Sequence, residues 1–114
     1  MFNPKSQEWH TVNALGRCPE PRAAHSAVVC RDNLIAFGGT NEENERLGDL
    51  WVFNFLEEQW SEVPPNIDIR PRSCHSASVV NNDKIVFFGG ITGVTKELDD
   101  LLLLDTKSME WKQI

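Results

Sequence analysis

The chain has 114 residues, 40% of them hydrophobic and 25% charged, and a net charge of −6 at pH 7. This composition is typical of a globular domain rather than of a disordered segment. The negative charge excludes nucleic acid and anionic membrane surfaces as main partners, because binding phosphate requires clustered Lys and Arg. No apolar run exceeds four residues, whereas a transmembrane helix needs roughly 18, so we expect no membrane span.

The beginning of the chain and its cysteines indicate the compartment. "MFNPKSQEWH" has Pro and charged residues where a secretory leader needs a continuous apolar stretch. The three cysteines, Cys18, Cys30 and Cys74, are odd in number and lack CxxC spacing. This pattern fits neither a disulfide framework nor a zinc site. We therefore expect a reducing, cytoplasmic location.

The first half of the chain predicts short strands. Residues 1–13 contain "MFNPKSQEW" and are followed by a variable segment. Next come two short runs of β-branched and aromatic residues, 25–30 and 33–39, joined by a tight Arg-Asp-Asn turn. A polar loop, 40–48, leads to a third run at 49–55. A turn then leads to a fourth run that begins at Trp60. This order predicts four antiparallel strands.

The second half repeats the same order of elements. Runs at 75–80 and 84–90 form another predicted hairpin, the segment 91–98 is a predicted polar loop, and a third run covers 100–105. The fourth run begins at Trp111. No window of 11 or more residues has helical spacing, and the runs are apolar at successive positions, as expected when both faces of a sheet are covered.

The repeat has a period of 51 residues. Trp9, Trp60 and Trp111 are separated by 60−9=51 and 111−60=51, and the glycine pairs agree, with 89−38=51. Phe2, Phe53 and Leu104 are equivalent in this register. The repeat divides the chain into the end of one unit, 1–13, and two complete units, 14–64 and 65–114. Four strands per unit of about 50 residues is the arithmetic of a β-propeller.

The ordered features resemble kelch repeats. A Pro-Arg and a His-Ser precede the first strand, a Gly pair follows the second, and a Trp comes 22 positions later (60−38 and 111−89). The resemblance covers two complete kelch motifs plus the end of a preceding one. It implies an all-β fold of four-stranded antiparallel blades that form an incomplete ring, with further kelch repeats in cis needed to close it. Many kelch units carry a Tyr where this chain has Phe53 and Leu104, which disfavours the adaptor subgroup.

Repetition at the period favours a structural role over a catalytic one, because a catalytic constellation needs different residues meeting at one point. The glycines are expected to adopt positive φ or to allow close backbone approach. "GGITGVTK" lacks the ending of a phosphate-binding loop, and we predict no cofactor, metal or catalytic residue. Arg22 and Arg72 are expected to form an ion pair or backbone contact between blades, or to face the channel and hold an anion. The predicted structural residues are Trp9, Arg22, His25, Gly38, Gly39, Trp60, Arg72, His75, Gly89, Gly90 and Trp111.

Alternating strands place two kinds of connection on one face: the loop between the second and third strands, and the segment that enters the next blade. Loops on a rigid scaffold commonly carry recognition. The predicted partner is another protein, which meets an acidic arc of loops around an inner ring of arginines. The residues predicted to contact it are Arg17, Glu42, Glu43, Glu45, Arg46, Arg70, Lys96 and Glu97.

The resemblance also implies a rival class. Propellers related to kelch include copper oxidases, sugar-acid mutarotases and iron-dependent specifier proteins. The oxidase cofactor needs a Tyr, and this chain has none. A specifier-type iron site needs spaced Glu, Asp and His, and no His lies in either loop that follows a Gly pair. We therefore predict a protein-interaction module, with a propeller enzyme or metal-dependent specifier-type protein as the alternative.

Overall fold

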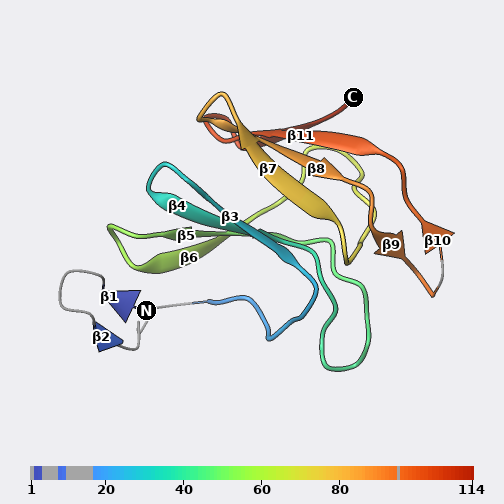
Figure 1. The fold of residues 1–114 in the computed structure, drawn as a ribbon, viewed down its shortest axis with the longest axis horizontal. Helices are drawn as coiled ribbons and strands as arrows, with labels where there is room; N and C mark the ends of the chain where they lie inside the picture. The colour runs from blue at the N-terminus through green and yellow to red at the C-terminus, as the bar shows by residue number, and fades with distance from the viewer. Residues whose placement is uncertain (1, 4–7, 10–16, 95) are drawn as a thin grey trace.

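The computed structural model describes residues 2–3, 8–9, 17–94 and 96–114. All regular secondary structure in these residues is β: two four-stranded antiparallel sheets and two short two-stranded ones (Figure 1). No helix in this part of the chain is long and apolar enough to span a membrane. The predicted fold class, all-β with four-stranded antiparallel blades, is confirmed.

The first sheet, which we call blade 1, has the strand order β3-β4-β5-β6. Its strands are β3 (Ser26–Cys30), β4 (Asn33–Phe37), β5 (Leu50–Asn54) and β6 (Gln59–Val63). Each strand pairs with the one that precedes it in sequence, so the sheet is a simple antiparallel meander.

The second sheet, blade 2, repeats this topology. Its strands are β7 (Ser76–Val80), β8 (Lys84–Phe88), β11 (Leu101–Asp105) and β12 (Glu110–Gln113), in the spatial order β7-β8-β11-β12. The fourth strands begin one residue before the tryptophans at which they were predicted to begin.

Two short hairpins complete the secondary structure. β1 (Phe2–Asn3) pairs with β2 (Glu8–Trp9), so Phe2 lies opposite Trp9. The third and fourth strands of the two blades show the same pairing, as Phe53 with Trp60 and Leu104 with Trp111. β9 (Ile91–Thr92) and β10 (Lys96–Glu97) form a hairpin within the segment predicted to be only a loop.

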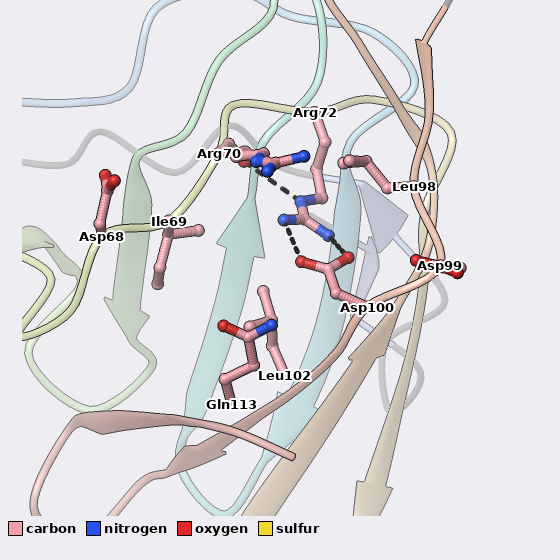
Figure 2. Close-up of a pocket in the computed structure, with 9 residues that line it drawn as sticks. All are labelled: Asp68, Ile69, Arg70, Arg72, Leu98, Asp99, Asp100, Leu102 and Gln113. Carbon is pink, nitrogen blue, oxygen red and sulfur yellow. Dashed lines mark hydrogen bonds and ion pairs between the residues drawn. The ribbon is translucent and has the colours of Figure 1, made fainter.

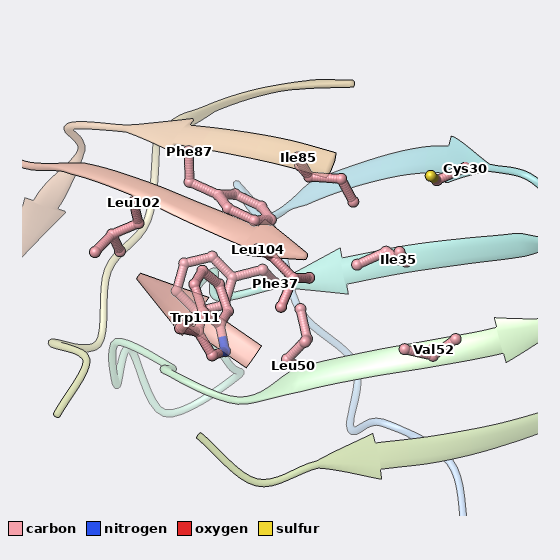
Figure 3. Packing of buried hydrophobic residues seen from close by; sticks show 10 residues of the cluster. All are labelled: Cys30, Ile35, Phe37, Leu50, Val52, Ile85, Phe87, Leu102, Leu104 and Trp111. Atoms are coloured by element: carbon pink, nitrogen blue, oxygen red, sulfur yellow. The ribbon is translucent and has the colours of Figure 1, made fainter. Parts of the chain in front are cut away.

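The core lies between the two blades (Figure 3). Side chains alternate across each strand, so Ile35 and Phe37 of blade 1 face Ile85 and Phe87 of blade 2, and all four are fully buried. The ring of Trp111 packs against both Phe37 and Phe87, with centroids 5.0 and 5.1 Å away. The buried cluster comprises Cys30, Ile35, Phe37, Leu50, Val52, Ile85, Phe87, Leu102, Leu104 and Trp111.

The glycine pairs allow blade 2 to approach blade 1. Gly38 and Gly39 have φ values of 70° and 102°, as their repeats Gly89 and Gly90 do at 69° and 100°. The Gly39 N–H donates to the carbonyl oxygen of Arg72 at 2.8 Å, and a Cβ on Gly38 would lie 2.6 Å from that oxygen. Positive φ and close approach therefore both require glycine here.

Candidate interaction face

The long connections of both blades emerge at one end of the sheets (Figure 1). They are the β4–β5 loop, the β8–β11 loop that contains β9 and β10, and the segments that enter β3 and β7. The short β5–β6 and β11–β12 turns lie at the opposite end, because consecutive strands are antiparallel. We call the end with the long connections the loop face.

The repeated arginines hold the carboxylate of their own blade. Arg22 donates two hydrogen bonds to Asp49, at 2.6 and 2.9 Å, and one to the carbonyl oxygen of Gly38 at 3.0 Å. Arg72 makes the same fork with Asp100, at 2.6 and 2.8 Å, and donates to the Gly89 carbonyl at 3.2 Å. Bidentate pairing holds the segment that enters the first strand of each blade against the start of the third strand.

The two expected contacts of these arginines are made by different groups. The ion pairs lie within one blade, whereas the backbone contact between blades is made by Arg72, whose N–H donates to the Leu47 carbonyl and whose carbonyl accepts from the Gly39 N–H. The arginines expected to form an inner ring are each neutralised by a carboxylate of their own blade, Arg22 by Asp49 and Arg72 by Asp100. A partner's carboxylate therefore has no free arginine at these positions.

The two aspartates have lowered pKa values. Burial would raise the pKa of Asp49, but hydrogen bonds from Arg22 and the Trp51 indole outweigh it, and the pKa is lowered. The hydrogen bonds from Arg72 lower the pKa of Asp100 against the opposing effect of burial. Both carboxylates therefore serve as fixed acceptors, not as proton donors near neutral pH.

A histidine and a serine from different blades meet between the sheets. The Nε2 atom of His75 lies 2.7 Å from Oγ of Ser26, and Ser26 is buried. Burial lowers the pKa of His75 to about 4, with a further contribution from the charge of Arg72. The imidazole is therefore neutral at physiological pH. Its Nδ1 atom is buried and has no hydrogen-bond partner among the described residues.

This Ser–His pair is not arranged for nucleophilic catalysis. A catalytic triad needs a third group that orients the histidine through its other nitrogen, and the part of the chain that the structure describes supplies none to Nδ1 of His75. Ser26 is also buried by the second blade, out of reach of a substrate. In the sequence Ser26 and Ser76 each directly follow a His, and this adjacency does not indicate the contact between blades. The available signal was the repetition itself, which places the His of one unit near the Ser of the previous one.

The tryptophans differ in their surroundings. Trp111 is 4% exposed in the core between the blades, whereas Trp60 is half-buried and packs on Phe53 at 5.1 Å. Trp51, which is not one of the tryptophans that recur every 51 residues, is buried and donates its indole N–H to Asp49 at 2.8 Å. The side chain of Trp9 lies outside the described residues.

The residues predicted to contact a partner fall into two groups. Arg46 is half-buried and contacts the loop of blade 2, donating to Ser73 Oγ and, at 3.1 Å, to the Gly93 carbonyl. Arg17 is exposed but pairs with Glu62 at 3.0 Å and lies over Trp51. The remaining predicted residues are exposed on the loop face: Glu42, Glu43, Glu45, Arg70, Lys96 and Glu97.

The described residues contain no cluster of three or more His, Cys, Asp or Glu side chains placed to bind a metal ion. Cys18 and Cys74 are exposed free thiols, and Cys30 is a buried one. The Sγ of Cys30 donates to the Asn82 carbonyl at 3.2 Å, which is another contact between the blades.

The 51-residue repeat, the glycine pairs with positive φ and the Arg–Asp ion pairs occur in the same places in both blades. The whole chain, residues 1–114, matches the family described as the KLHDC2/KLHL20/DRC7 Kelch-repeats domain. The chain belongs to the kelch-repeat family. The resemblance drawn from the sequence motifs is thereby confirmed.

Individual kelch relatives have diverse names. The chain is 35% identical to N-(sulfonatooxy)prop-2-enimidothioate sulfolyase of Thlaspi arvense over 92% of its length, which is 31% of that protein. It is 30% identical to an F-box/kelch-repeat protein of Arabidopsis thaliana, covering 91% of the chain and 24% of the relative. It is 31% identical to host cell factor 1 of Homo sapiens, covering 90% and 5%. The chain thus spans less than a third of each of these relatives.

Proposed function

We propose that this kelch domain is a protein-interaction module that binds a basic segment of another protein through its loop face. The two blades form the rigid part, and the β4–β5 and β8–β11 loops supply the contacts. Further kelch repeats in cis complete the ring around them, and the module acts in the cytoplasm.

One observation supports this proposal most strongly: the repeated arginines are paired with Asp49 and Asp100 within the chain. The acidic side chains that differ between the repeats, Glu42, Glu43, Glu45 and Glu97, are exposed. Once Asp49 and Asp100 are assigned to their arginines, the β4–β5 loop retains three Glu and Arg46, which gives 1−3=−2. The β8–β11 loop retains Lys96 against Glu97 and Asp99, which gives 1−2=−1. The loops thus present a negative field that favours a partner rich in Lys or Arg.

The acidic side chains of the β4–β5 loop belong to a turn that is held by hydrogen bonds. The side-chain oxygen of Asn41 accepts the backbone N–H groups of Glu43 and Glu45, at 3.1 and 2.9 Å. This arrangement fixes the loop backbone and leaves the carboxylates of Glu42 and Glu43 in solvent. A pre-formed loop binds with less loss of conformational entropy than a flexible one.

Reversal of the loop charges tests the proposal. A variant with Glu42, Glu43 and Glu45 changed to Lys should lose partner capture, measured by affinity purification and mass spectrometry of proteins whose retention falls with added salt. A matched variant with Glu57, Glu58 and Glu110 changed to Lys places the same charge change at the opposite end and should retain capture. Equal capture by both variants would remove the loop face as the binding site.

A second candidate function is that of a propeller enzyme. The similarity to a sulfolyase over 92% of the chain favours it. Metal analysis of the intact protein, together with an assay on N-(sulfonatooxy)prop-2-enimidothioate, decides between the two classes. Stoichiometric iron or copper, or turnover of that substrate, would replace the interaction module with an enzyme.

A further inference from the structure

The two blades hold different buried residues at the second position of the third strand. In blade 1 this position holds Trp51, which is 4% exposed. Its indole N–H donates to Asp49 Oδ2 at 2.8 Å, and the guanidinium of Arg17 lies 5.4 Å from the ring centroid. The Arg17 guanidinium is itself held by Glu62, which pairs with Trp51 across β5 and β6. The indole is therefore enclosed between a carboxylate and a cation.

In blade 2 the equivalent residue, 51 positions later, is Leu102. A cavity of about 400 Å³ adjoins it, within the size range of roughly 300–1,000 Å³ typical of ligand pockets. The floor is formed by Asp100, in its fork with Arg72, and by Leu102, while Ile69 and Arg70 line it from the segment that enters β7 (Figure 2). Gln113 also lines it and pairs with Leu102 as Glu62 pairs with Trp51.

We propose that this cavity is a docking pocket for the indole ring of a tryptophan from the partner protein. This rests on the proposed function and names one anchor residue of the partner. The docked ring occupies the place in blade 2 that Trp51 occupies in blade 1. Its N–H donates to the carboxylate of Asp100, its faces contact Leu102 and Ile69, and Arg70 lies over it as Arg17 lies over Trp51.

Blade 1 shows that each of these contacts is compatible with the others. Asp49 accepts two hydrogen bonds from Arg22 and a third from an indole at the same time, so Asp100 has capacity for a third donor beside Arg72. A guanidinium over an indole is a favourable cation–π arrangement. Asp68, Asp99 and Asp100 against Arg70 and Arg72 give the pocket a charge of 2−3=−1, which disfavours an anionic occupant.

Indole probes test the pocket in the intact protein. We expect saturation-transfer NMR to show millimolar binding of 3-methylindole, and 1,3-dimethylindole, which lacks the N–H, to bind about fivefold or more weakly because a hydrogen bond contributes about 1 kcal/mol. Leu102→Trp fills the cavity with the side chain that blade 1 carries and should reduce 3-methylindole binding about tenfold or more, by the loss of the site. Its thermal midpoint should be unchanged or raised, which shows that the variant is folded.

The matched variant acts in the opposite direction. Trp51→Leu should open an equivalent pocket in blade 1 and add a second 3-methylindole site. Three results would each overturn the proposal: no binding of 3-methylindole at several times the expected millimolar constant, undiminished binding to folded Leu102→Trp, or tighter binding of n-butylamine than of 3-methylindole. The last would show that the pocket selects a cation.

The same experiment separates the pocket from the loop charges. The Glu42, Glu43 and Glu45 reversal leaves the cavity intact and should bind 3-methylindole as the unmodified protein does. Loss of partner capture in that reversal together with undiminished probe binding to Leu102→Trp would remove the pocket alone. If Leu102→Trp lost probe binding and the charge reversal left partner capture unchanged, the acidic loops would be rejected as the binding site and the pocket would remain.

Discussion

Blade 1 and blade 2 have the same sequence pattern but different surroundings, and the difference shows what the second blade contributes. Phe37 and Phe88 are equivalent residues that follow the same strand pattern, yet Phe37 is fully buried and Phe88 is 51% exposed. Ser26 is buried against His75, whereas its repeat Ser76 is exposed. A kelch repeat therefore specifies a blade whose apolar face is completed only by its neighbour.

The largest expected effect compares the two phenylalanines. Phe37→Ala should reduce the free energy of unfolding by about 3–5 kcal/mol, because it removes a fully buried ring and leaves a cavity. Phe88→Ala should cost about 1 kcal/mol or less, because half of its surface is already in solvent. Urea unfolding of the 114-residue chain measures both. Equal losses would mean that the two blades have equivalent surroundings.

The Arg–Asp forks should behave alike in both blades, because each lies within one sheet. Asp49→Asn and Asp100→Asn each leave a buried guanidinium without its counter-ion and should cost about 3 kcal/mol. Glu62→Gln removes only the exposed pair with Arg17 and should cost less than about 1 kcal/mol. If Asp49→Asn lowered the free energy of unfolding and Asp100→Asn did not, the Arg–Asp pair would depend on a neighbouring blade.

Acidification should weaken the contact between the blades before it affects the forks. The pKa of His75 is about 4 in the folded chain and 6.5 in the unfolded chain, so the unfolded chain takes up the proton first. Stability is fully present above pH 6.5 and is lost as the pH falls toward 4, by about 1–2 kcal/mol, since partial solvent exposure reduces the effect.

His75→Asn is the matched variant for this pH effect. Its stability should change less between pH 6.5 and 4 than that of the unmodified chain, as followed by urea unfolding at each pH. The loss below about pH 3.8, where the lowered pKa values of Asp49 and Asp100 apply, should remain in both proteins. An identical pH profile for the two proteins would remove His75 as the sensitive group.

The smallest expected effect compares the two serines. Ser26→Ala removes the hydrogen-bond partner of a buried imidazole and should cost about 1 kcal/mol. Ser76→Ala changes an exposed side chain and should fall within about 0.5 kcal/mol of zero. Thermal unfolding of the two variants distinguishes them. Matching midpoints would contradict the assignment of Ser26 to the contact between blades.

The fold was predictable because the repeat carries its own register. Two copies of one pattern, aligned by Trp60 and Trp111, are sufficient to mark the eight strands of the two blades and the hairpin turns between them. The glycines could be interpreted for the same reason, since Gly38 and Gly89 recur where the backbone must adopt positive φ. Local patterns of apolar and turn residues were sufficient for these features.

The site was less predictable because its contacts join distant residues. The forks of Arg22 and Arg72 connect positions 27 and 28 residues apart, and which blade each Asp belongs to depends on the sheet topology. The left-handed conformations of Ala24 and Cys74, φ 57° and 60°, carry no signal in residue type. The pocket beside Leu102 is formed by side chains from three separate segments, and residue types alone do not specify how these segments lie.

Amide hydrogen exchange of the 114-residue chain tests the central claim, that the surroundings of a repeated residue are set by the blade beside it. The Gly39 N–H donates to the Arg72 carbonyl of blade 2, and the described residues record no acceptor for the equivalent N–H of Gly90. We predict that exchange at Gly39 is slowed at least about a hundredfold relative to Gly90, since it requires separation of the blades. Equal exchange at the two glycines would contradict the account.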